Sequence, residues 1–216
     1  MGRKRVTMAK MLALLAILTL VSWLLLQLPG FVDFDTNLFL YVNSFYNQNL
    51  AVLLNAFTFL GSVWMGFIWV ATLFFFKRRD LALYVLVAVL MEIAYEYVAK
   101  DLVNRPRPYE ALANVKYVAA QFGHSFPSGH AAGAFVIAAV VGMKERWTLL
   151  PLVFISVLVA LSRVYIGVHY PFDIVGGAIA GSIIGFYVAK MDLSPLQAYF
   201  GKLGDRLFKT RSKSPS

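Results

Sequence analysis

Five side chains in three separate polar segments are of the types that handle phosphate. Lys100, Arg107 and Arg163 are cations, and His130 and His169 are imidazoles that can move protons or attack phosphorus. One cation alone could merely extend its charged head to water at a membrane surface. Three together suit phosphate oxygens, because they donate charge-assisted hydrogen bonds. We therefore expect the three segments to converge on an oxyanion site with two imidazoles.

An anion cradle is also expected where Pro127-Ser128-Gly129-His130 opens a helix. Ser128 and Gly129 would supply free backbone N–H groups at the positive end of the helix dipole. Because Gly129 has no side chain, a ligand can approach the backbone closely there. Taken alone this segment is weak evidence, since such turns are common at helix starts.

The two imidazoles are expected to differ in role. His169 and Asp173 are spaced i, i+4, so a helical turn beginning near Pro171 would place Asp173 beneath His169. A carboxylate that binds one ring nitrogen aims the other at the substrate, which predicts that His169 is the nucleophile. His130, at the helix start, is placed to protonate the leaving oxygen. Two His and one Asp could hold a metal, but the neighbouring cations would repel it, so neither a metal nor another cofactor is expected.

Together the three segments resemble the signature of the type 2 phosphatidic acid phosphatase superfamily. These membrane lipid phosphatases share an active site with the vanadium haloperoxidases. The signature is Lys, six residues, Arg-Pro; then Pro-Ser-Gly-His; then Ser-Arg, five residues, His, three residues, Asp. The segments 100–108, 127–130 and 162–173 match every fixed position in order and spacing.

The resemblance implies a role for each matching residue. The phosphate would be bound by Lys100, Arg107, Ser128, Gly129 and Arg163. His169 would form a phosphohistidine while Asp173 orients it. His130 would protonate the leaving group and then activate water, with no metal required.

Composition assigns the chain to the membrane. Of 216 residues, 60% are hydrophobic and 14% are charged, and the mean hydropathy is +0.69. An ordinary soluble domain is roughly 45–50% apolar and about 25% charged, so a soluble enzyme and a disordered chain are excluded. The absence of Cys excludes a thiolate nucleophile. The net charge of +9 is expected to face anionic lipid, not nucleic acid.

The apolar segments predict an all-α integral membrane protein built as a six-transmembrane-helix bundle. The spans are expected at about 11–28, 50–76, 81–99, 128–143, 148–166 and 172–190. The first is too long for a signal-peptide core and lacks a small-residue cleavage site, which favours an uncleaved anchor. Residues 1–190 would form the phosphatase domain, with its motif region at 100–173. Residues 191–216 would form a basic tail that is either an interfacial helix followed by disorder or simply solvated.

Basic residues predict the orientation of the bundle. Of the 20 Lys and Arg, 15 fall at the ends that include both termini and five at the other ends. The positive-inside rule then places both termini in the cytoplasm and the active site on the extracytoplasmic face of a multi-pass cell-membrane protein. The segments 29–49 and 100–127 would be external loops.

Two smaller patterns also carry expectations. Glu92, Glu96 and Lys100 share one helix face, and Glu96 is expected to support Lys100, with headgroup contact as the alternative. Two stripes of small residues predict close helix packing. One span carries Gly177, Gly181 and Gly185, and another carries Gly129 and Gly133.

The sequence thus predicts a metal-independent lipid phosphatase whose partners are the bilayer and a lipid phosphate substrate. Polyprenyl diphosphate, phosphatidylglycerophosphate and phosphatidic acid are the candidate substrates, and polyprenyl diphosphate is favoured by family analogy. A phosphotransferase with the same residues, and a non-catalytic protein that binds lipid phosphate, are the alternatives. Nothing in the sequence specifies an oligomeric state.

Overall fold

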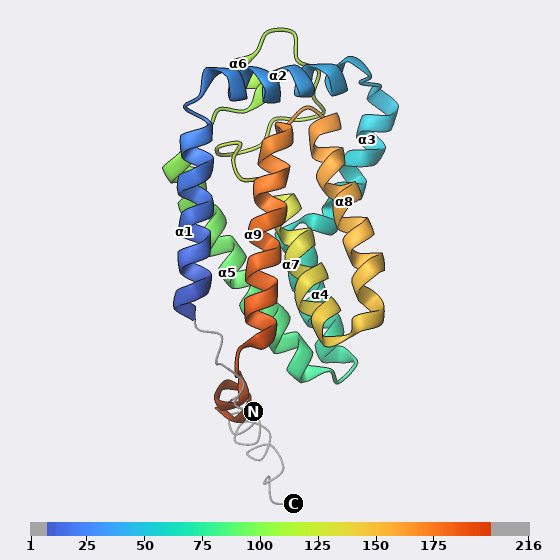
Figure 1. Cartoon of the computed structure of the whole chain (residues 1–216). Coiled ribbons are helices and arrows are strands. Elements are labelled where there is room, and N and C mark those ends of the chain that lie inside the picture. The colour runs from blue at the N-terminus through green and yellow to red at the C-terminus, as the bar shows by residue number, and fades with distance from the viewer. Residues whose placement is uncertain (1–7, 200–216) are drawn as a thin grey trace, which may run out of the picture.

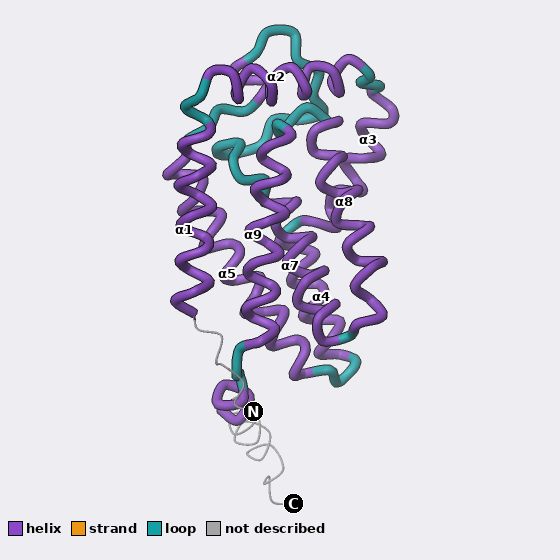
Figure 2. The backbone as a smooth tube through the Cα atoms, in the orientation of Figure 1, coloured by secondary structure: helices purple, strands orange, loops and turns teal. Residues whose placement is uncertain are grey.

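The computed structural model of the chain describes residues 8–199, and every regular element within that range is a helix (Figure 2). The longer helices are α1 (Met8–Leu25), α2 (Pro29–Ser44), α3 (Gln48–Phe57), α4 (Val63–Phe75), α5 (Arg79–Val103), α7 (Gly129–Lys144), α8 (Leu149–Tyr165) and α9 (Pro171–Lys190). The short ones are η1 (Thr58–Gly61), α6 (Pro108–Ala111) and η2 (Arg146–Thr148). Residues 194–199 add a helical turn, and the rest of the expected interfacial helix lies outside the described residues.

The all-α membrane class is confirmed, whereas the span count is met only in part. Within residues 8–199, the stretches of α1, α5, α8 and α9 are long and apolar enough to cross a membrane, and the bent pair α3–α4 would make a fifth span. The remaining predicted span corresponds to α7, which is apolar but has only 16 residues. The predicted boundaries of α1, α5, α7, α8 and α9 agree with the observed ones to within a few residues.

The predicted second span is broken instead of continuous. The chain bends by 51° between the α3–η1 stretch and α4. Ser62 starts the new helix there, because its hydroxyl accepts from the backbone N–H of Met65 at 3.2 Å. A Cβ on Gly61 would lie 2.3 Å from the carbonyl oxygen of His130, so the turn at η1 approaches the start of α7 as closely as only glycine allows.

The segment 29–49 was wrongly predicted to be a loop, because most of it forms α2. Pro29 opens this helix, where its fixed φ suits the first turn. The helix buries one face through Asp35, Phe39 and Asn43 and exposes aromatic side chains on another. This amphipathic pattern is too short and too polar to span a membrane, and α2 lies across the end of the upright helices (Figure 1).

The centre of the bundle is α7, which packs against α5, α8, α9 and η1. The glycine stripe of α9 makes this packing close. A Cβ on Gly177 would lie 2.4 Å from the Ser128 carbonyl oxygen, and one on Gly181 would lie 2.2 Å from that of Ala132. The prediction that this stripe serves packing is confirmed.

The three polar segments meet at the end of the bundle covered by α2. The end of α5, the start of α7 and the α8–α9 connection all reach this end, and the long loop after α5 crosses it (Figures 1 and 2). The opposite end holds the start of α1, the end of α9 and the short α4–α5 connection.

Candidate active site

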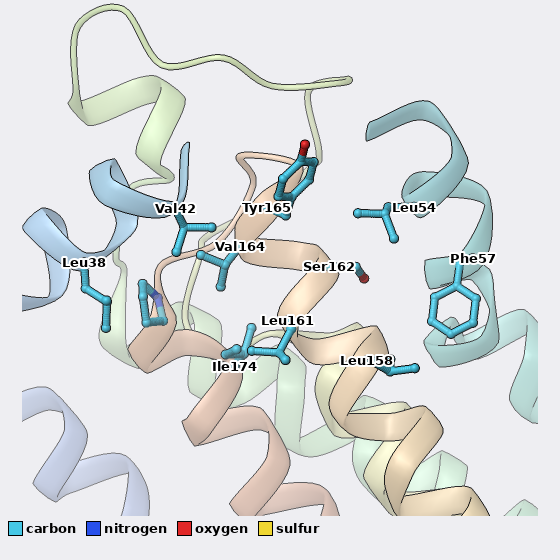
Figure 3. A pocket seen from close by; sticks show the side chains of 11 residues that line it. Leu38, Val42, Leu54, Phe57, Leu158, Leu161, Ser162, Val164, Tyr165 and Ile174 are labelled. Carbon is cyan, nitrogen blue, oxygen red and sulfur yellow. The ribbon is translucent and has the colours of Figure 1, made fainter. Parts of the chain in front are cut away.

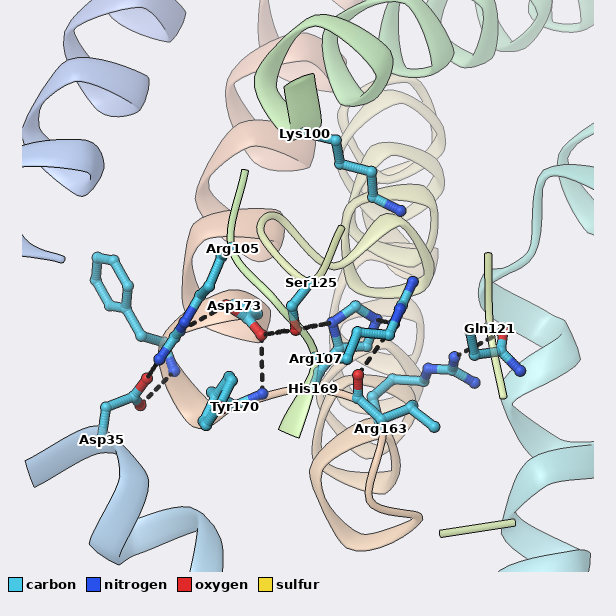
Figure 4. Close-up of polar contacts among 12 residues, drawn as sticks. Asp35, Lys100, Arg105, Arg107, Gln121, Ser125, Arg163, His169, Tyr170 and Asp173 are labelled. Atoms are coloured by element: carbon cyan, nitrogen blue, oxygen red, sulfur yellow. Dashed lines mark hydrogen bonds and ion pairs between the residues drawn. The ribbon is translucent and has the colours of Figure 1, made fainter. Parts of the chain in front are cut away.

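The carboxylate of Asp173 is held by partners from three segments (Figure 4). Asp173 is the third residue of α9, completely buried, and its Oδ1 accepts from Arg105 at 2.7 Å. Its Oδ2 accepts from the Ser125 hydroxyl at 2.5 Å and from the backbone N–H of Tyr170 at 2.8 Å. The same oxygen lies 3.6 Å from Nδ1 of His169. The start of α9 therefore brings the predicted pair together, as the i, i+4 spacing indicated.

The two ring nitrogens of His169 face different groups. Nδ1 faces the Ser125 hydroxyl at 3.5 Å as well as the Asp173 carboxylate, whereas Nε2 lies 3.3 Å from NH1 of Arg107. Because a guanidinium can only donate, Nε2 must carry the lone pair and Nδ1 the proton. The ring thus presents an unprotonated nitrogen toward the cations, the form that a nucleophilic histidine needs.

Burial keeps this imidazole neutral. The His169 side chain is 2% exposed, and burial lowers its pKa to about 3, although the nearby Asp173 carboxylate acts in the opposite direction. The positive charge of Arg107 lowers the pKa further. At neutral pH, Nε2 of His169 is therefore unprotonated without the help of a separate base.

Arg107 donates hydrogen bonds to three backbone carbonyl groups. Its Nε donates to the carbonyl of Gly123 at 2.9 Å, its NH1 to that of Val168 at 3.0 Å and its NH2 to that of Phe122 at 3.0 Å. Burial lowers the pKa of Arg107, yet an arginine remains charged at neutral pH. The side chain therefore fastens the 104–127 loop to the residue before His169 while its charge remains in the site.

Arg163, from the end of α8, is almost wholly buried and only partly satisfied. NH1 donates to the Thr58 hydroxyl at 3.1 Å and NH2 to the Gln121 side-chain oxygen at 3.4 Å. Its Nε has no partner among the described residues, and the same holds for the buried hydroxyl of Ser128. Buried polar groups are nearly always paired. These two atoms are free to bind an anion between the start of α7 and the end of α8.

At the start of α7, where an anion cradle was predicted, the Ser128 N–H is not free. Ser128 precedes the helix, its backbone N–H donates to the Asp173 carbonyl at 3.0 Å, and Gly129 is the first helical residue. The imidazole of His130 lies within electrostatic range of Arg163, His169, Lys100 and Arg107, so the structure brings both predicted imidazoles into one site.

Lys100 reaches the site from the end of α5 (Figure 4). Its Nζ lies 2.7 Å from Oε1 of Glu96, one turn earlier on the helix. The Glu96 carboxylate rests against the start of α7, because a Cβ on Gly129 would lie 2.1 Å from Oε1 and 2.4 Å from Oε2. The proximity of Lys100 and Glu96 follows from their spacing, whereas the contact with Gly129 does not.

Three polar partners of Asp173 or of its neighbours were not predicted. Arg105 bridges two buried carboxylates, with NH2 2.6 Å from Oδ2 of Asp35 on α2. Its guanidinium also lies 3.8 Å from the ring centre of Tyr170. Burial alone would lower the pKa of Arg105, but the Asp173 and Asp35 carboxylates raise it overall. One feature of the sequence could have pointed to Arg105: it is a basic residue at an end of the bundle that has few basic residues. No feature of the sequence pointed to Ser125 or Asp35.

Metal-binding geometry is not found in the described range. Within residues 8–199, no group of three or more His, Asp or Glu side chains could hold a metal ion. The charged side chains that converge with His130 and His169 are chiefly cationic, which suits an anion.

Two apolar cavities lie away from this site. One of about 580 Å³ opens between α2, α3, α8 and the start of α9, with a lining that is apolar apart from Ser162 and the Tyr165 hydroxyl (Figure 3). A second of about 620 Å³ lies between α1 and α5. No predicted site residue lines either one. Because they open on candidate membrane spans, we expect hydrocarbon chains to fill them.

Comparisons with known proteins match the part of the chain that holds the three polar segments. The family model described as PAP2 superfamily matches residues 81–193. The chain is 30% identical over 168 residues to an undecaprenyl-diphosphatase of Sulfolobus acidocaldarius, covering 74% of this chain and 80% of that protein.

Two solved structures share the fold. The crystal structure of LpxE from Aquifex aeolicus has a TM-score of 0.66 and 32% identity, covering 71% of this chain and 93% of that one. A transmembrane PAP2-type phosphatidylglycerolphosphate phosphatase from Bacillus subtilis has a TM-score of 0.66 and 23% identity, covering 83% and 92%. The second likeness concerns the fold alone.

Proposed function

The chain belongs to the PAP2 superfamily, and from that membership we propose that it hydrolyses a polyprenyl diphosphate at the extracytoplasmic face of a membrane. It is a multi-pass membrane lipid phosphatase. The substrate, the orientation, the residue roles and the reaction steps below are the parts that we propose.

The unpartnered donors beside His169 carry the proposal. Arg163 Nε and the Ser128 hydroxyl lack partners within residues 8–199, and Nε2 of His169 faces the Arg107 guanidinium. A buried donor without an acceptor costs roughly 1–3 kcal/mol. A phosphate there would accept from both donors and present phosphorus to Nε2.

In the first step, Nε2 of His169 attacks the terminal phosphorus and forms an N–P bond. The bond from phosphorus to the leaving oxygen breaks in line, and His130 gives that oxygen a proton. Lys100, Arg107 and Arg163, with the amides that start α7, stabilise the charge on the remaining oxygens. Asp173 stabilises the positive ring through Nδ1, and a phosphohistidine results.

In the second step, His130 is neutral and takes a proton from a water molecule. The resulting hydroxide attacks phosphorus, the N–P bond breaks, and inorganic phosphate leaves with His169 restored. The cations already supply the positive charge that a metal ion would otherwise provide, so the reaction needs no added metal.

Six spans are proposed for the domain of residues 1–190. Five come from α1, the bent α3–α4 pair, α5, α8 and α9, and α7 supplies the sixth. At 1.5 Å per residue α7 is about 24 Å long, short for a span that faces lipid. Because α7 is enclosed by other helices, it need not match the bilayer by itself.

The active-site end is proposed to face away from the cytoplasm. Of the five basic residues at that end, Arg105, Arg107 and Arg163 are buried in the site. Because their contacts within the site explain why these three residues lie at this end, the positive-inside rule is applied to the remaining basic residues of the chain. Residues 191–216 would then form a basic tail at the cytoplasmic surface.

A polyprenyl diphosphate is supported by the undecaprenyl-diphosphatase relative. Phosphatidylglycerophosphate and phosphatidic acid also present phosphate at a membrane surface, and they remain the competing substrates.

The deciding experiment is phosphate release by the purified protein in detergent from these three lipids, with and without EDTA. Release from undecaprenyl diphosphate, fastest of the three and unaffected by EDTA, is the expected result. Release that required an added lipid or sugar hydroxyl would identify a phosphotransferase. Binding without release from any lipid would identify a non-catalytic protein.

A further inference from the structure

We propose that Glu96 occupies the phosphate site of the ligand-free enzyme and competes with inorganic phosphate for it, so that the carboxylate promotes product release. The inference deepens the proposed function and rests on it. Glu96 acts here on binding and release of phosphate, not on the chemical step.

The position of the Glu96 carboxylate is the first observation. It rests on Gly129 at the first turn of α7, where a Cβ would overlap both of its oxygens. Oε1 pairs with Lys100 at 2.7 Å, and the negative charge acts on Arg107 and Arg163. The carboxylate therefore contacts the helix start and Lys100, and it lies within electrostatic range of Arg107 and Arg163, the other two cations that are proposed to bind phosphate.

The Glu96 carboxylate and inorganic phosphate are chemically similar anions. A carboxylate and a phosphate both accept charge-assisted hydrogen bonds from cations and from helix-start amides. Two anions cannot share the space above Gly129, and they would repel each other at this distance. Phosphate must therefore displace Glu96 on entry, and Glu96 can return as phosphate leaves.

Glu92 helps to keep Glu96 in this place. It lies one turn earlier on the same face of α5, is 3% exposed and interacts with Glu96. Retreat of the Glu96 carboxylate along the helix toward Glu92 would move its charge into a buried, apolar region, which is unfavourable. The site is thus the favourable place for the Glu96 charge until phosphate arrives.

Glu96→Gln tests the competition. Glutamine keeps the length and one oxygen that can accept from Lys100, but it removes the charge. Inhibition by inorganic orthophosphate should then become stronger, with Ki falling roughly tenfold or more, the scale of one charge-assisted hydrogen bond. Asp101→Asn is the matched control, because it removes the same charge from an exposed residue of α5 next to Lys100, and its Ki should stay within about twofold of wild type.

A purely supporting role for Glu96 predicts the opposite sign. If Glu96 only positions Lys100, Glu96→Gln would leave orthophosphate affinity unchanged or weaken it, and that result would overturn the proposal. Should Glu96→Gln fail to fold, Glu96→Asp withdraws the carboxylate from Gly129 by one methylene, and Ki should again fall. A rise or no change in that variant would equally refute the competition.

Calorimetric titration with orthophosphate separates this inference from the proposed function. A wild type that hydrolyses no lipid phosphate would contradict the function. The same preparation would still show whether Glu96→Gln binds orthophosphate more tightly than wild type, as the competition requires.

Discussion

Arg105 and Asp173 form an ion pair that is buried next to the proposed nucleophile, with NH1 2.7 Å from Oδ1. The other guanidinium nitrogen pairs with Asp35, so α2 is fastened through Arg105 to the carboxylate that faces His169. Asp35 also accepts from the backbone N–H of Phe172 at 2.9 Å, at the first turn of α9. The helix that covers the site therefore helps to set the position of its carboxylate.

Loss of this connection should slow catalysis with little effect on phosphate binding. We expect Arg105→Gln to lower kcat roughly 10–100-fold, the usual effect of removing a group that orients an active-site residue, and Arg105→Lys to lower it less. The orthophosphate Ki should change little. Asp33→Asn, on the exposed side of α2, is the control and should behave as wild type.

A spectroscopic readout distinguishes positioning from simple destabilisation. The chain has three histidines, so ¹⁵N-histidine labelling gives three imidazoles. In wild type, His169 should appear as the single Nδ1–H tautomer, and in Arg105→Gln as a mixture. A folded Arg105→Gln protein with normal kcat and an unchanged tautomer would contradict the assigned role.

His169→Ala should abolish turnover while the protein still folds and inserts. His169 is the histidine whose unprotonated Nε2 faces Arg107, so its loss removes the nitrogen that is proposed to form the N–P bond. Wild type quenched without acid should carry a phosphoryl group on His169, detectable by mass spectrometry. Activity at the wild-type level in His169→Ala would refute the mechanism.

Burial of neutral His169 predicts how stability depends on pH. Its pKa is about 3 when folded, against 6.5 for an ordinary histidine, so the unfolded chain binds the proton first. Stability from this residue is present above about pH 6.5 and is lost as pH falls toward 3. Between pH 7 and pH 5, wild type should lose roughly 2 kcal/mol more than His169→Asn. Thermal unfolding in detergent would show this as a steeper fall of Tm, and parallel Tm curves would refute it.

Vanadate should inhibit the enzyme, because five ligands around vanadium mimic in-line attack by His169 and transition-state mimics bind tightly.

Arg163→Lys keeps the charge but loses the planar fork, including Nε, so kcat/KM should fall roughly 100-fold and vanadate inhibition should weaken. Arg146→Lys, exposed at the opposite end of the bundle, is the control. Activity that disappeared with EDTA and returned only with Mg²⁺ would point to a metal-dependent phosphatase.

The proposed orientation can be tested with single cysteines, since the chain has none. Ala113 is an exposed loop position at the active-site end, and it is preferable to Asn114, whose φ of 61° disfavours cysteine. Ala113→Cys should react with an impermeant thiol reagent in intact cells. Asp80→Cys, exposed at the other end, should react only after lysis. The reverse pattern would place the active site in the cytoplasm.

Much of the helical framework could be predicted from the sequence because it depends on local properties. Long apolar segments identify α1, α5, α8 and α9 wherever they pack, since backbone groups in lipid must be satisfied within the helix. The pairing of Glu96 with Lys100 follows from a spacing of four residues within α5. The approach of His169 to Asp173 follows from the short turn that leads into α9.

The features that were missed depend on residues far apart in the chain. Arg105 reaches Asp35 and Asp173 across 70 and 68 residues, and no spacing rule links such positions. The helical state of α2 depends on its buried face meeting the bundle end, and the break at Gly61 depends on the approach to His130. Neither partner is apparent in the local sequence.

The sequence by itself determined the membrane class and the family, and it singled out the residues proposed to bind phosphate, because composition and motif spacing are carried within short segments. Only the tertiary structure decided which partners satisfy each buried charge. Charge burial is favourable only when the whole set of contacts is made. Thus Arg105 links Asp35 to Asp173, Ser125 donates to Asp173, and Glu96 lies against Gly129, through the packing of α2, α5, α7 and α9 around one site.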